Sequence, residues 1–410
     1  MRHWIRMTKR VAWLAMVAMG SAPAAVAQTP AGDWPQWRGP NRDGISAETG
    51  WSARWPEGGP KVLWTSEKLG SGYSTVSVVD GRVYTMGNDG KQDTIWCLDA
   101  DTGKEVWRHA YPCKKGGYPG PRATPTVHDA RVYTVSREGD VACLDAKTGK
   151  VFWSKDLAKE VNADVPGWGV AGSPLILGDL VVYNINAGVA LRKDTGAIAW
   201  KTPRAKNGYS TPVPFKDGDR QCLLIFAAKG LVCVDAGTGA RIWEVPWKTA
   251  YDVNAADPIV VGDRIFICSG YGKGCAMIRA AGGKAEVLWT RKTMGSQFST
   301  PVLHQGHLYG GDGNVGKARV QCIDFDTGQE KWSSGRMGMV SLMMADGKLI
   351  IRGDKGVLAI AEATPEAYKQ IAFAKVLGGM CWTMPVLADG KIYVRNNRRG
   401  ELACLDVSGK

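Results

Sequence analysis

The segment Leu98–Trp107, LDADTGKEVW, decides the fold, because copies of it recur along most of the chain. Close copies are LDAKTGKVFW at 144–153, VDAGTGARIW at 234–243 and IDFDTGQEKW at 323–332. A shorter form, RKDTGAIAW, ends at Trp200, and a degenerate form, AAGGKAEVLW, ends at Trp289. Counted from Trp64, the closing tryptophans stand 43 to 47 residues apart. This regular spacing indicates a repeat architecture with one tryptophan in each unit, and it explains why the chain has 17 tryptophans but only 7 phenylalanines.

The residues of the repeated segment have structural tasks. The aspartate carboxylate accepts backbone N–H groups across a tight turn, and the glycine supplies the positive φ that a β-carbon resists. The closing tryptophan lies on an outer strand, where its ring fits between neighbouring units. We expect these residues to be structural: Asp99, Asp145, Asp235 and Asp324; Gly103, Gly149, Gly239 and Gly328; Trp64, Trp107, Trp153, Trp200, Trp243, Trp289 and Trp332.

A second landmark precedes each tryptophan segment. It is a Ser/Thr-Pro or related pair that opens a run of alternating apolar residues, near residues 75, 124, 173, 211, 257, 300, 341 and 384. Each unit then contains four short apolar runs separated by Asp-Gly or Gly turns. Four strands in a unit of this length predict an all-β fold, an eight-bladed β-propeller with four-stranded antiparallel blades.

The two ends of the chain are expected to share one blade. The last unit ends LDVSGK at Lys410, before its fourth strand. The segment 61–65, which contains Trp64, matches the tryptophan strand and has no unit of its own. We therefore predict that this N-terminal strand completes the last blade and closes the ring, which protects both open edges. Residues 61–410 are then one propeller domain.

The repeat resembles the tryptophan-docking motif of quinoprotein dehydrogenases and the wider PQQ-like propeller repeat family, over roughly residues 61–410. That family includes dehydrogenases that use pyrroloquinoline quinone (PQQ) and also the non-catalytic propeller of the outer-membrane barrel-assembly machinery. The resemblance therefore implies the fold but leaves the activity open. The segment DWPQWRGPNRDGIS at 33–46 looks like the N-terminal stretch of exported PQQ-like repeat proteins.

The first 27 residues have the features of a signal peptide. Arg2, Arg6, Lys9 and Arg10 precede the apolar run 11–20, and the small residues 25–27 form a cleavage site that would leave Gln28 as the first residue. The protein is thus expected to be exported, to the periplasm or outside the cell, and the mature chain shows no apolar run long enough to span a membrane. Residues 28–60 form an extension that we expect to pack on the ring, and the role of residues 33–46 is left open.

The number and distribution of charged residues limit the class of partner that the protein can bind. Removing residues 1–27 takes away four bases and no acids, which lowers the formal charge from +13 to +9. The bases are dispersed, so a nucleic-acid partner is not expected.

Five cysteines occupy one repeated slot and are interpreted as small buried residues: Cys97, Cys143, Cys233, Cys322 and Cys404. The pairing of the other five is left open: Cys113, Cys222, Cys268, Cys275 and Cys381.

The features of a quinoprotein dehydrogenase are missing from the sequence. Such an enzyme needs a redox cofactor, a Ca²⁺ ion that polarises it and a carboxylate base. The family resemblance adds a vicinal disulfide in the alcohol-dehydrogenase branch, but this chain has no adjacent cysteines, no sequential Asp/Asn calcium loop and no residues to spare for a lid. We therefore expect no catalytic residues, no metal and no cofactor. PQQ with Ca²⁺ belongs to the alternative, an enzyme oxidising an alcohol or a sugar.

A candidate ligand site lies where the chain approaches each innermost strand, because these segments of a propeller face the central channel. The side chains expected at this mouth are aromatic, amide and charged groups: Tyr73, Arg122, Trp168, Asn207, Tyr209, Asp252, Asn254, Asp257, Gln297, Arg336 and Trp382. Asp257 stands where most other units have Ser or Thr, so it is expected to pair with Arg122 or Arg336, or to bind a cation. The resulting hypothesis is a monomeric, non-catalytic scaffold that binds a protein or an anionic envelope polymer.

Overall fold

The computed structural model describes Met1 and residues 32–409 of the 410-residue chain. The chain divides into two units, 1–30 and 31–410, and only the second is described below. The predicted signal peptide and its cleavage site before Gln28 lie outside the described residues, Met1 apart. Within the described part, no helix is long and apolar enough to cross a membrane.

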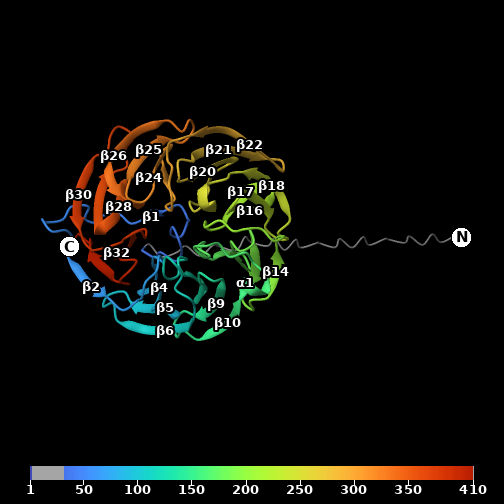
Figure 1. Ribbon diagram of the computed structural model, residues 1–410, viewed down its shortest axis with the longest axis horizontal. Coiled ribbons are helices and arrows are strands. Elements are labelled where there is room, and N and C mark those ends of the chain that lie inside the picture. The colour runs from blue at the N-terminus through green and yellow to red at the C-terminus, as the bar shows by residue number, and fades with distance from the viewer. Residues whose placement is uncertain (2–31, 410) are drawn as a thin grey trace. The chain divides into compact units, whose positions relative to one another are not determined.

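The strands form eight sheets arranged around a central axis (Figure 1). Each sheet has four strands in antiparallel order, and the seventh carries one additional strand. Sheets that are consecutive in the sequence are neighbours in the ring, as the continuous change of colour around Figure 1 shows. The predicted eight-bladed β-propeller is therefore confirmed.

The first four blades follow one another along the chain. Blade 1 consists of β3 (Ser77–Val79), β4 (Arg82–Asn88), β5 (Gln92–Asp99) and β6 (Glu105–Pro112). Blade 2 consists of β7 (Thr126–His128), β8 (Arg131–Val135), β9 (Asp140–Asp145) and β10 (Val151–Asp156). Blade 3 consists of β11 (Leu175–Leu177), β12 (Leu180–Tyr183), β13 (Val189–Arg192) and β14 (Ile198–Lys201). Blade 4 consists of β15 (Val213–Asp217), β16 (Arg220–Ala227), β17 (Gly230–Asp235) and β18 (Arg241–Pro246).

The other four blades complete the ring. Blade 5 consists of β19 (Ile259–Val261), β20 (Arg264–Ser269), β21 (Gly274–Ala281) and β22 (Lys284–Arg291). Blade 6 consists of β23 (Val302–His304), β24 (His307–Asp312), β25 (Ala318–Asp324) and β26 (Glu330–Gly338). Blade 7 consists of β27 (Val340–Ala345), β28 (Lys348–Gly353), β29 (Val357–Glu362) and β30 (Gln370–Lys375), with β1 (Ile45–Ser46) beside β27. Blade 8 consists of β31 (Val386–Ala388), β32 (Lys391–Arg395), β33 (Leu402–Asp406) and β2 (Val62–Ser66).

Among the described residues, helical structure is confined to three short pieces in connections: α1 (Leu157–Glu160), η1 (Ala250–Asp252) and η2 (Asp354–Gly356). The middle strands of each blade are buried along almost their whole length, since another blade covers each of their faces. The outermost strands alternate: in β6 the side chain of Trp107 is buried while most of its strand neighbours are exposed. This pattern agrees with the period-2 alternation of the sequence.

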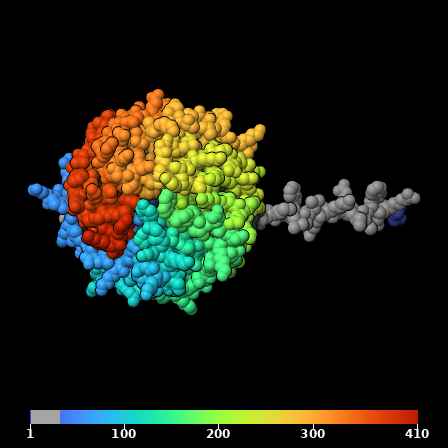
Figure 2. Space-filling view, in the orientation of Figure 1, coloured from blue at the N-terminus to red at the C-terminus, as the bar shows by residue number. Residues whose placement is uncertain are grey.

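Ring closure takes place as predicted. Strand β2 pairs antiparallel with β33, with Trp64 opposite Cys404. In Figure 2 the C-terminal red residues lie against blue and cyan residues of the N-terminal part. In the same blade, on β32, the guanidinium of Arg395 is fully buried and donates hydrogen bonds to Ser74 O (2.8 Å) and Met86 O (2.6 Å). A charge-assisted bond network therefore joins blade 8 to blade 1.

The closing tryptophans lie between neighbouring blades. The indole N–H of Trp64 donates to Ala100 O of the next blade at 2.9 Å, and that of Trp200 donates to Ala236 O at 2.9 Å. The indole ring of Trp64 also packs against the turn glycine Gly103, which has a φ of +67°. A β-carbon on Gly103 would lie 2.5 Å from this indole ring. Trp107, Trp153, Trp289 and Trp332 donate in the same way.

Trp243 is the exception, because blade 5 has the degenerate turn AAGG in place of Asp-x-x-Thr-Gly. Its indole N–H is buried and has no hydrogen-bond partner among the described residues. In the regular turns the aspartate acts as expected: Asp99 Oδ1 accepts the backbone N–H of Thr102 at 3.1 Å and the hydroxyl of Thr102 at 2.9 Å.

The N-terminal segment 33–54 packs against the ring at the end where the innermost strands finish. Trp34 forms a two-way backbone bridge with Val78, and β1 runs parallel to β27 with Ile45 opposite Met344. The buried guanidinium of Arg38 donates to Thr300 O (3.0 Å) and Pro301 O (2.9 Å). Residues 33–46, whose role the sequence left open, thus enter the channel from this end.

All ten cysteines belong to the described part of the chain, and all are buried and free. The five of the repeated slot lie on the third strand of their blades, which agrees with their interpretation as small buried residues. Burial raises the pKa of these thiols, that of Cys97 to about 12, so they are held in the neutral form.

Candidate functional site

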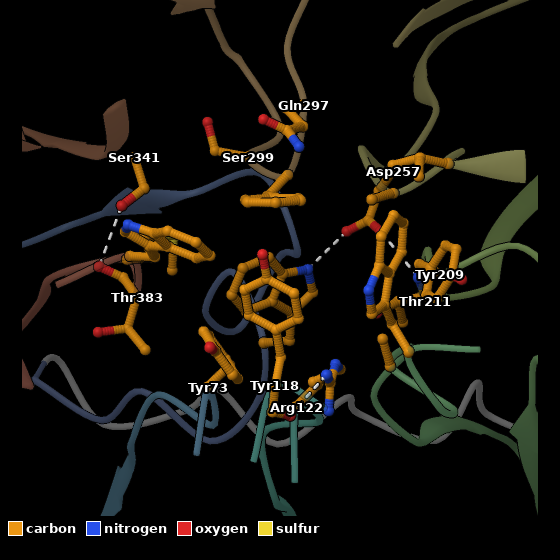
Figure 3. A pocket seen from close by; sticks show the side chains of 18 of the residues that line it. Tyr73, Tyr118, Arg122, Tyr209, Thr211, Asp257, Gln297, Ser299, Ser341 and Thr383 are labelled. Atoms are coloured by element: carbon orange, nitrogen blue, oxygen red, sulfur yellow. Dashed lines mark hydrogen bonds between the residues drawn. The ribbon is translucent and has the colours of Figure 1, made fainter. Parts of the chain in front are cut away.

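A cavity of about 260 Å³ occupies the centre of the ring at the end where the innermost strands begin. Its wall comes mainly from the segments that lead into those strands, and all eight blades contribute to it, blade 7 through Ser341 in β27. Figure 3 shows the labelled side chains arranged around this common space. We call it the aromatic cup, after the rings that line it: Trp37, Tyr73, Tyr118, Trp168, Tyr209, Tyr271, Phe298 and Trp382.

The rings of the aromatic cup contact one another in tilted and edge-on arrangements. Trp382 packs against Phe298 and Tyr73, with ring centroids 5.5 and 5.8 Å apart. On the other side, Trp168 packs against Tyr209 at 6.0 Å and against Tyr118 at 6.4 Å. Such distances are in the favourable range for aromatic pairs. The wall is therefore a continuous aromatic surface whose parts hold one another in place.

The floor of the cup comes from the N-terminal segment. Trp37 lies in the channel and lines the cup, and its indole N–H donates a hydrogen bond to Asp257 Oδ2 at 2.6 Å. The neighbouring Arg38 is anchored to Thr300 and Pro301 below it. The cup is thus closed at its inner end by residues that precede the propeller in the sequence.

Asp257 belongs to a chain of hydrogen bonds that runs from blade to blade around the channel. The backbone N–H of Thr124 donates to Ser173 Oγ (2.9 Å), and that of Ser173 donates to Thr211 Oγ1 (3.0 Å). The N–H of Thr211 donates to Asp257 Oδ1 (2.8 Å), and that of Asp257 to Thr300 Oγ1 (2.8 Å). The recurrent Ser/Thr of the second landmark therefore links the blades, and Asp257 performs this task with one oxygen while the other accepts Trp37.

The expected pairing of Asp257 with Arg122 or Arg336 is wrong. Both carboxylate oxygens are bonded to N–H groups of Thr211 and Trp37, and the nearby positive charge is that of Arg38. Burial raises the pKa of the Asp257 carboxyl to about 6, while Arg38 and the two N–H donors oppose this shift. A buried carboxylate with few donors holds its proton more tightly, which is the observed direction.

Arg122 is the one positively charged side chain among the residues that line the cup. Its guanidinium lies over the Tyr73 ring, 5.2 Å from the centroid, and donates to Gly120 O (2.8 Å) and Tyr118 O (2.9 Å). Burial lowers the pKa of Arg122 to about 10, so the side chain keeps its charge at neutral pH. Its carbonyl bonds fix the loop that carries Tyr118.

Most polar atoms of the cup are already bonded within the protein. Gln297 donates to the Tyr271 hydroxyl (2.8 Å) and accepts the N–H of Val315 (2.8 Å). Ser341 Oγ donates to Thr383 O at 3.0 Å. Together with the saturated carboxylate of Asp257, these bonds leave mainly the aromatic side chains to offer free polar atoms, such as the buried indole N–H of Trp382, which has no partner among the described residues. The lining of the cup is therefore predominantly aromatic.

Seven of the eleven predicted mouth residues line the cup: Tyr73, Arg122, Trp168, Tyr209, Asp257, Gln297 and Trp382. The other four do not. Asn207 and Asn254 are fully buried and bond to backbone, since Asn207 Oδ1 accepts Asn186 N–H (2.7 Å) and Asn254 Nδ2 donates to Ala227 O (2.9 Å). Their amides fix loops, because each supplies partners that the irregular backbone lacks.

Asp252 and Arg336, the remaining two predicted residues, lie outside the lining of the cup. Asp252 forms ion pairs with Lys206 (2.9 Å) and Lys229 (2.8 Å). Arg336 lies on the outer strand β26 opposite Arg319 and is exposed, because that strand continues to Gly338. The sequence interpretation assigned its segment to the channel, and this placement is wrong.

The structure adds four aromatic residues to those expected at the mouth. Phe298 directly follows the predicted residue Gln297, and Tyr118 lies four residues before the predicted Arg122, so both positions could have been found from the sequence. Tyr271 lies in the β20–β21 turn and Trp37 in the N-terminal segment. Neither position follows from the repeat pattern, because only the tertiary structure brings them to the channel.

The lining residues do not fit a calcium-bound quinone. Ca²⁺ takes six to eight oxygen ligands, whereas the one carboxylate of the cup already accepts two N–H groups. Within the described residues no group of three or more His, Cys, Asp or Glu side chains is placed to hold a metal ion. PQQ carries three carboxylates, and Arg122 alone would face them.

Comparisons with known proteins agree with the fold. The family model described as "Outer membrane protein assembly factor BamB" matches residues 93–334. The protein of that name from Burkholderia pseudomallei is 29% identical over 49% of this chain and 63% of its own. The quinoprotein ethanol dehydrogenase of Pseudomonas aeruginosa is 30% identical over 38% of this chain and 28% of its own. The chain thus spans less than two thirds of these relatives.

Among solved structures, BamB from Moraxella catarrhalis superimposes with a TM-score of 0.62 and 16% identity, covering 85% of this chain and 99% of that one. The fold and the cup define the class: an eight-bladed propeller of PQQ-like repeats with an aromatic cup in its channel. Because the family model covers more than half of the residues, the chain belongs to the family described as outer membrane protein assembly factor BamB.

Proposed function

We propose that this protein is an exported, non-catalytic binding platform that holds a protein partner in the periplasm against the mouth of its propeller. The observation that carries the proposal is the aromatic cup, a predominantly aromatic surface at the channel mouth where the polar side chains of Asp257, Gln297 and Ser341 already bond within the protein. Membership of the outer membrane assembly factor family supports a protein partner, and export rests on the sequence of residues 1–27.

Two physical properties suit the cup for binding. Aromatic rings are enriched as anchors of protein interfaces, and the cup includes the exposed side chain of Tyr118, 41% accessible. Beside the cup, the ring of Tyr251 is 72% accessible and packs against Trp168 and Tyr271. The frame is rigid, because hydrogen bonds such as that from Thr211 to Asp257 connect one blade to the next. Binding to a preformed surface avoids the entropy cost of ordering loops.

Neither charged side chain that lines the cup is free to act in catalysis. A general base is most often a carboxylate or imidazole that can take a proton from substrate. Asp257 is buried and saturated by Thr211 and Trp37. Arg122, the other charged group, is bonded to carbonyls of its own loop.

Site-specific photocrosslinking tests the proposal in the periplasm of the source cell. A benzophenone amino acid is placed at position 118, in the cup, or at position 152, where Phe152 is exposed on the outer strand β10. We expect a discrete protein adduct from position 118 that is absent at 152. The adduct should weaken in Trp168→Ala/Trp382→Ala and persist in Arg336→Ala, since Arg336 lies outside the cup. Equal adducts at both positions, or none, would contradict the platform.

An anionic envelope polymer is the other partner that the net charge allows. A crosslinked smear from position 118 that glycosidases remove, and proteases leave intact, would favour the polymer over a protein.

The alternative function is a PQQ-dependent dehydrogenase, which the identity to the Pseudomonas aeruginosa enzyme favours. Reconstitution with PQQ and Ca²⁺, followed by a dye-linked assay with alcohols and sugars, distinguishes the two. Stoichiometric quinone binding with turnover would replace the platform proposal with this one.

A further inference from the structure

We propose that the aromatic cup receives a single aromatic side chain from an acidic segment of the partner protein. The ligand is thus an acidic peptide with an aromatic anchor. This inference rests on the proposed function and specifies the chemistry by which the platform recognises its partner. It is supported by the shape, the polarity and the charge of the mouth.

The shape of the cup suits a side chain. Trp37 and its bond to Asp257 close the inner end, so a ligand enters from one side only and a through-running polymer is excluded. A volume of about 260 Å³ accommodates one aromatic ring with the neighbouring backbone. The wall rings already form pairs with centroids 5.5 to 6.4 Å apart, such as Phe298–Trp382 and Trp168–Tyr118. An inserted ring would extend the same packing.

The polarity of the cup disfavours a sugar. A saccharide carries a hydroxyl on most of its carbons, and each hydroxyl removed from water without a partner costs free energy. Gln297, Ser341 and Asp257 already bond within the protein. The buried indole N–H of Trp382 has no partner among the described residues, but a single donor does not match the several hydroxyls of a saccharide. An aromatic side chain makes no such demand, so it gains from burial in this wall without losing hydrogen bonds.

The charge around the cup favours an acidic ligand. The loops at the mouth end carry exposed bases that form no ion pair within the described residues: Lys114, Lys115, Lys292, Lys355, Arg398 and Arg399. They come from the β6–β7, β22–β23, η2 and β32–β33 loops, which surround the cup on several sides. At the opposite end many bases pair with carboxylates, as in Arg82–Asp99 and Lys391–Asp389, although Lys104, Lys147 and Arg220 are exposed there without an ion pair among the described residues. Unpaired positive charge thus surrounds the mouth, where it complements acidic residues flanking the anchor.

Binding of defined peptides to the full mature chain tests the inference. The peptide is seven residues of alternating Glu and Asp with one central Trp. The comparisons are the same peptide with central Ala, a Lys/Arg peptide with central Trp, and polygalacturonate as an anionic glycan. Affinities are measured by calorimetry at two salt concentrations. We expect the acidic Trp peptide to bind at least tenfold more tightly than either other peptide, and its affinity to fall with salt.

Variants locate the binding. Tyr118→Ala and Trp168→Ala should each weaken the acidic Trp peptide at least tenfold, while Phe152→Ala, on the outer strand β10, should leave its affinity unchanged. Tyr118 is an exposed loop residue, so its variant remains informative if Trp168→Ala fails to fold.

Two results would overturn the inference. One is equal affinity for the Trp and Ala peptides, including the absence of binding by both. The other is polygalacturonate that binds more tightly and displaces the peptide. If either result occurs while position 118 still crosslinks a protein, the proposed binding platform is retained. Only the proposed ligand, an acidic segment with an aromatic anchor, is then wrong. If the crosslink is also absent, the platform itself is contradicted.

Discussion

The indole N–H of Trp37 donates a hydrogen bond of 2.6 Å to Asp257, which lies 220 residues further along the chain. This bond joins the N-terminal segment to the blade-to-blade hydrogen bonds of the channel. It also gives the aromatic cup its floor. The carboxyl that accepts it is buried, and its protonation therefore affects the stability of the whole arrangement.

The first prediction concerns pH. The pKa of Asp257 is raised by burial from its ordinary value of 3.8 to about 6. Between these values the unfolded chain releases the proton that the native state keeps, so the free energy of unfolding falls as pH rises from about 4 to about 6. The predicted loss from this group is about 3 kcal/mol, complete above pH 6.

Chemical denaturation of wild type and Asp257→Asn at pH 4 and pH 7 measures this effect. The variant is expected to be less stable at pH 4, because its amide NH₂ faces one of the two N–H donors. Its stability should nevertheless change less with pH. Burial also raises the pKa of Asp93 to about 6, so some pH dependence remains. Identical pH slopes in the two proteins would contradict the role assigned to Asp257.

The second prediction concerns the indole hydrogen bonds between blades. Trp200 and Trp243 are similarly buried, at 6% and 8% accessible, but only Trp200 has a partner for its N–H. Both Trp→Phe substitutions remove one ring, while Trp200→Phe also leaves Ala236 O without its donor. The free energy of unfolding should therefore fall by about 1 kcal/mol more for Trp200→Phe than for Trp243→Phe. Equal losses in urea denaturation would show that the indole bond contributes nothing.

The third prediction concerns the turn glycines. Gly103 and Gly81 have the same φ of +67°, but a β-carbon on Gly103 meets the Trp64 ring at 2.5 Å, whereas Gly81 has open space around it. Gly81→Ala should cost only the backbone strain of about 1–2 kcal/mol. Gly103→Ala should cost several kcal/mol by thermal or urea denaturation, because it forces blades 8 and 1 apart. A similar loss for both substitutions would mean that the glycine is needed for its φ alone.

The fourth prediction separates the two tasks of the N-terminal region. Deleting residues 28–70 removes β2 and leaves β33 as an unpaired edge, so an open, aggregating protein is expected. Deleting residues 28–58 retains β2 and should give a closed ring without the Trp37 floor. Size-exclusion chromatography and peptide binding test both. A soluble, cooperatively unfolding chain after the longer deletion would show that β2 is not needed for closure.

Several features of the site follow from repeat positions, and others do not. Trp168, Tyr209 and Trp382 were predicted because each precedes an innermost strand, and the ring brings all such segments to one mouth. Arg336 was assigned wrongly because strand β26 continues through it, and the length of an outer strand depends on its pairing with β25. A repeat pattern locates strands, but it does not determine where each one ends.

The sequence by itself determined the propeller, its eight blades and the closure of the ring. These depend on local patterns, the alternation of apolar residues and the turn chemistry of segments such as LDADTGKEVW, which recur at a fixed interval. Only the tertiary structure decided that Trp37 enters the channel, that Asp257 bonds to it, and that Tyr271 completes the aromatic cup. The reason is physical: such contacts join residues that are far apart in the chain, and no period in the sequence relates them.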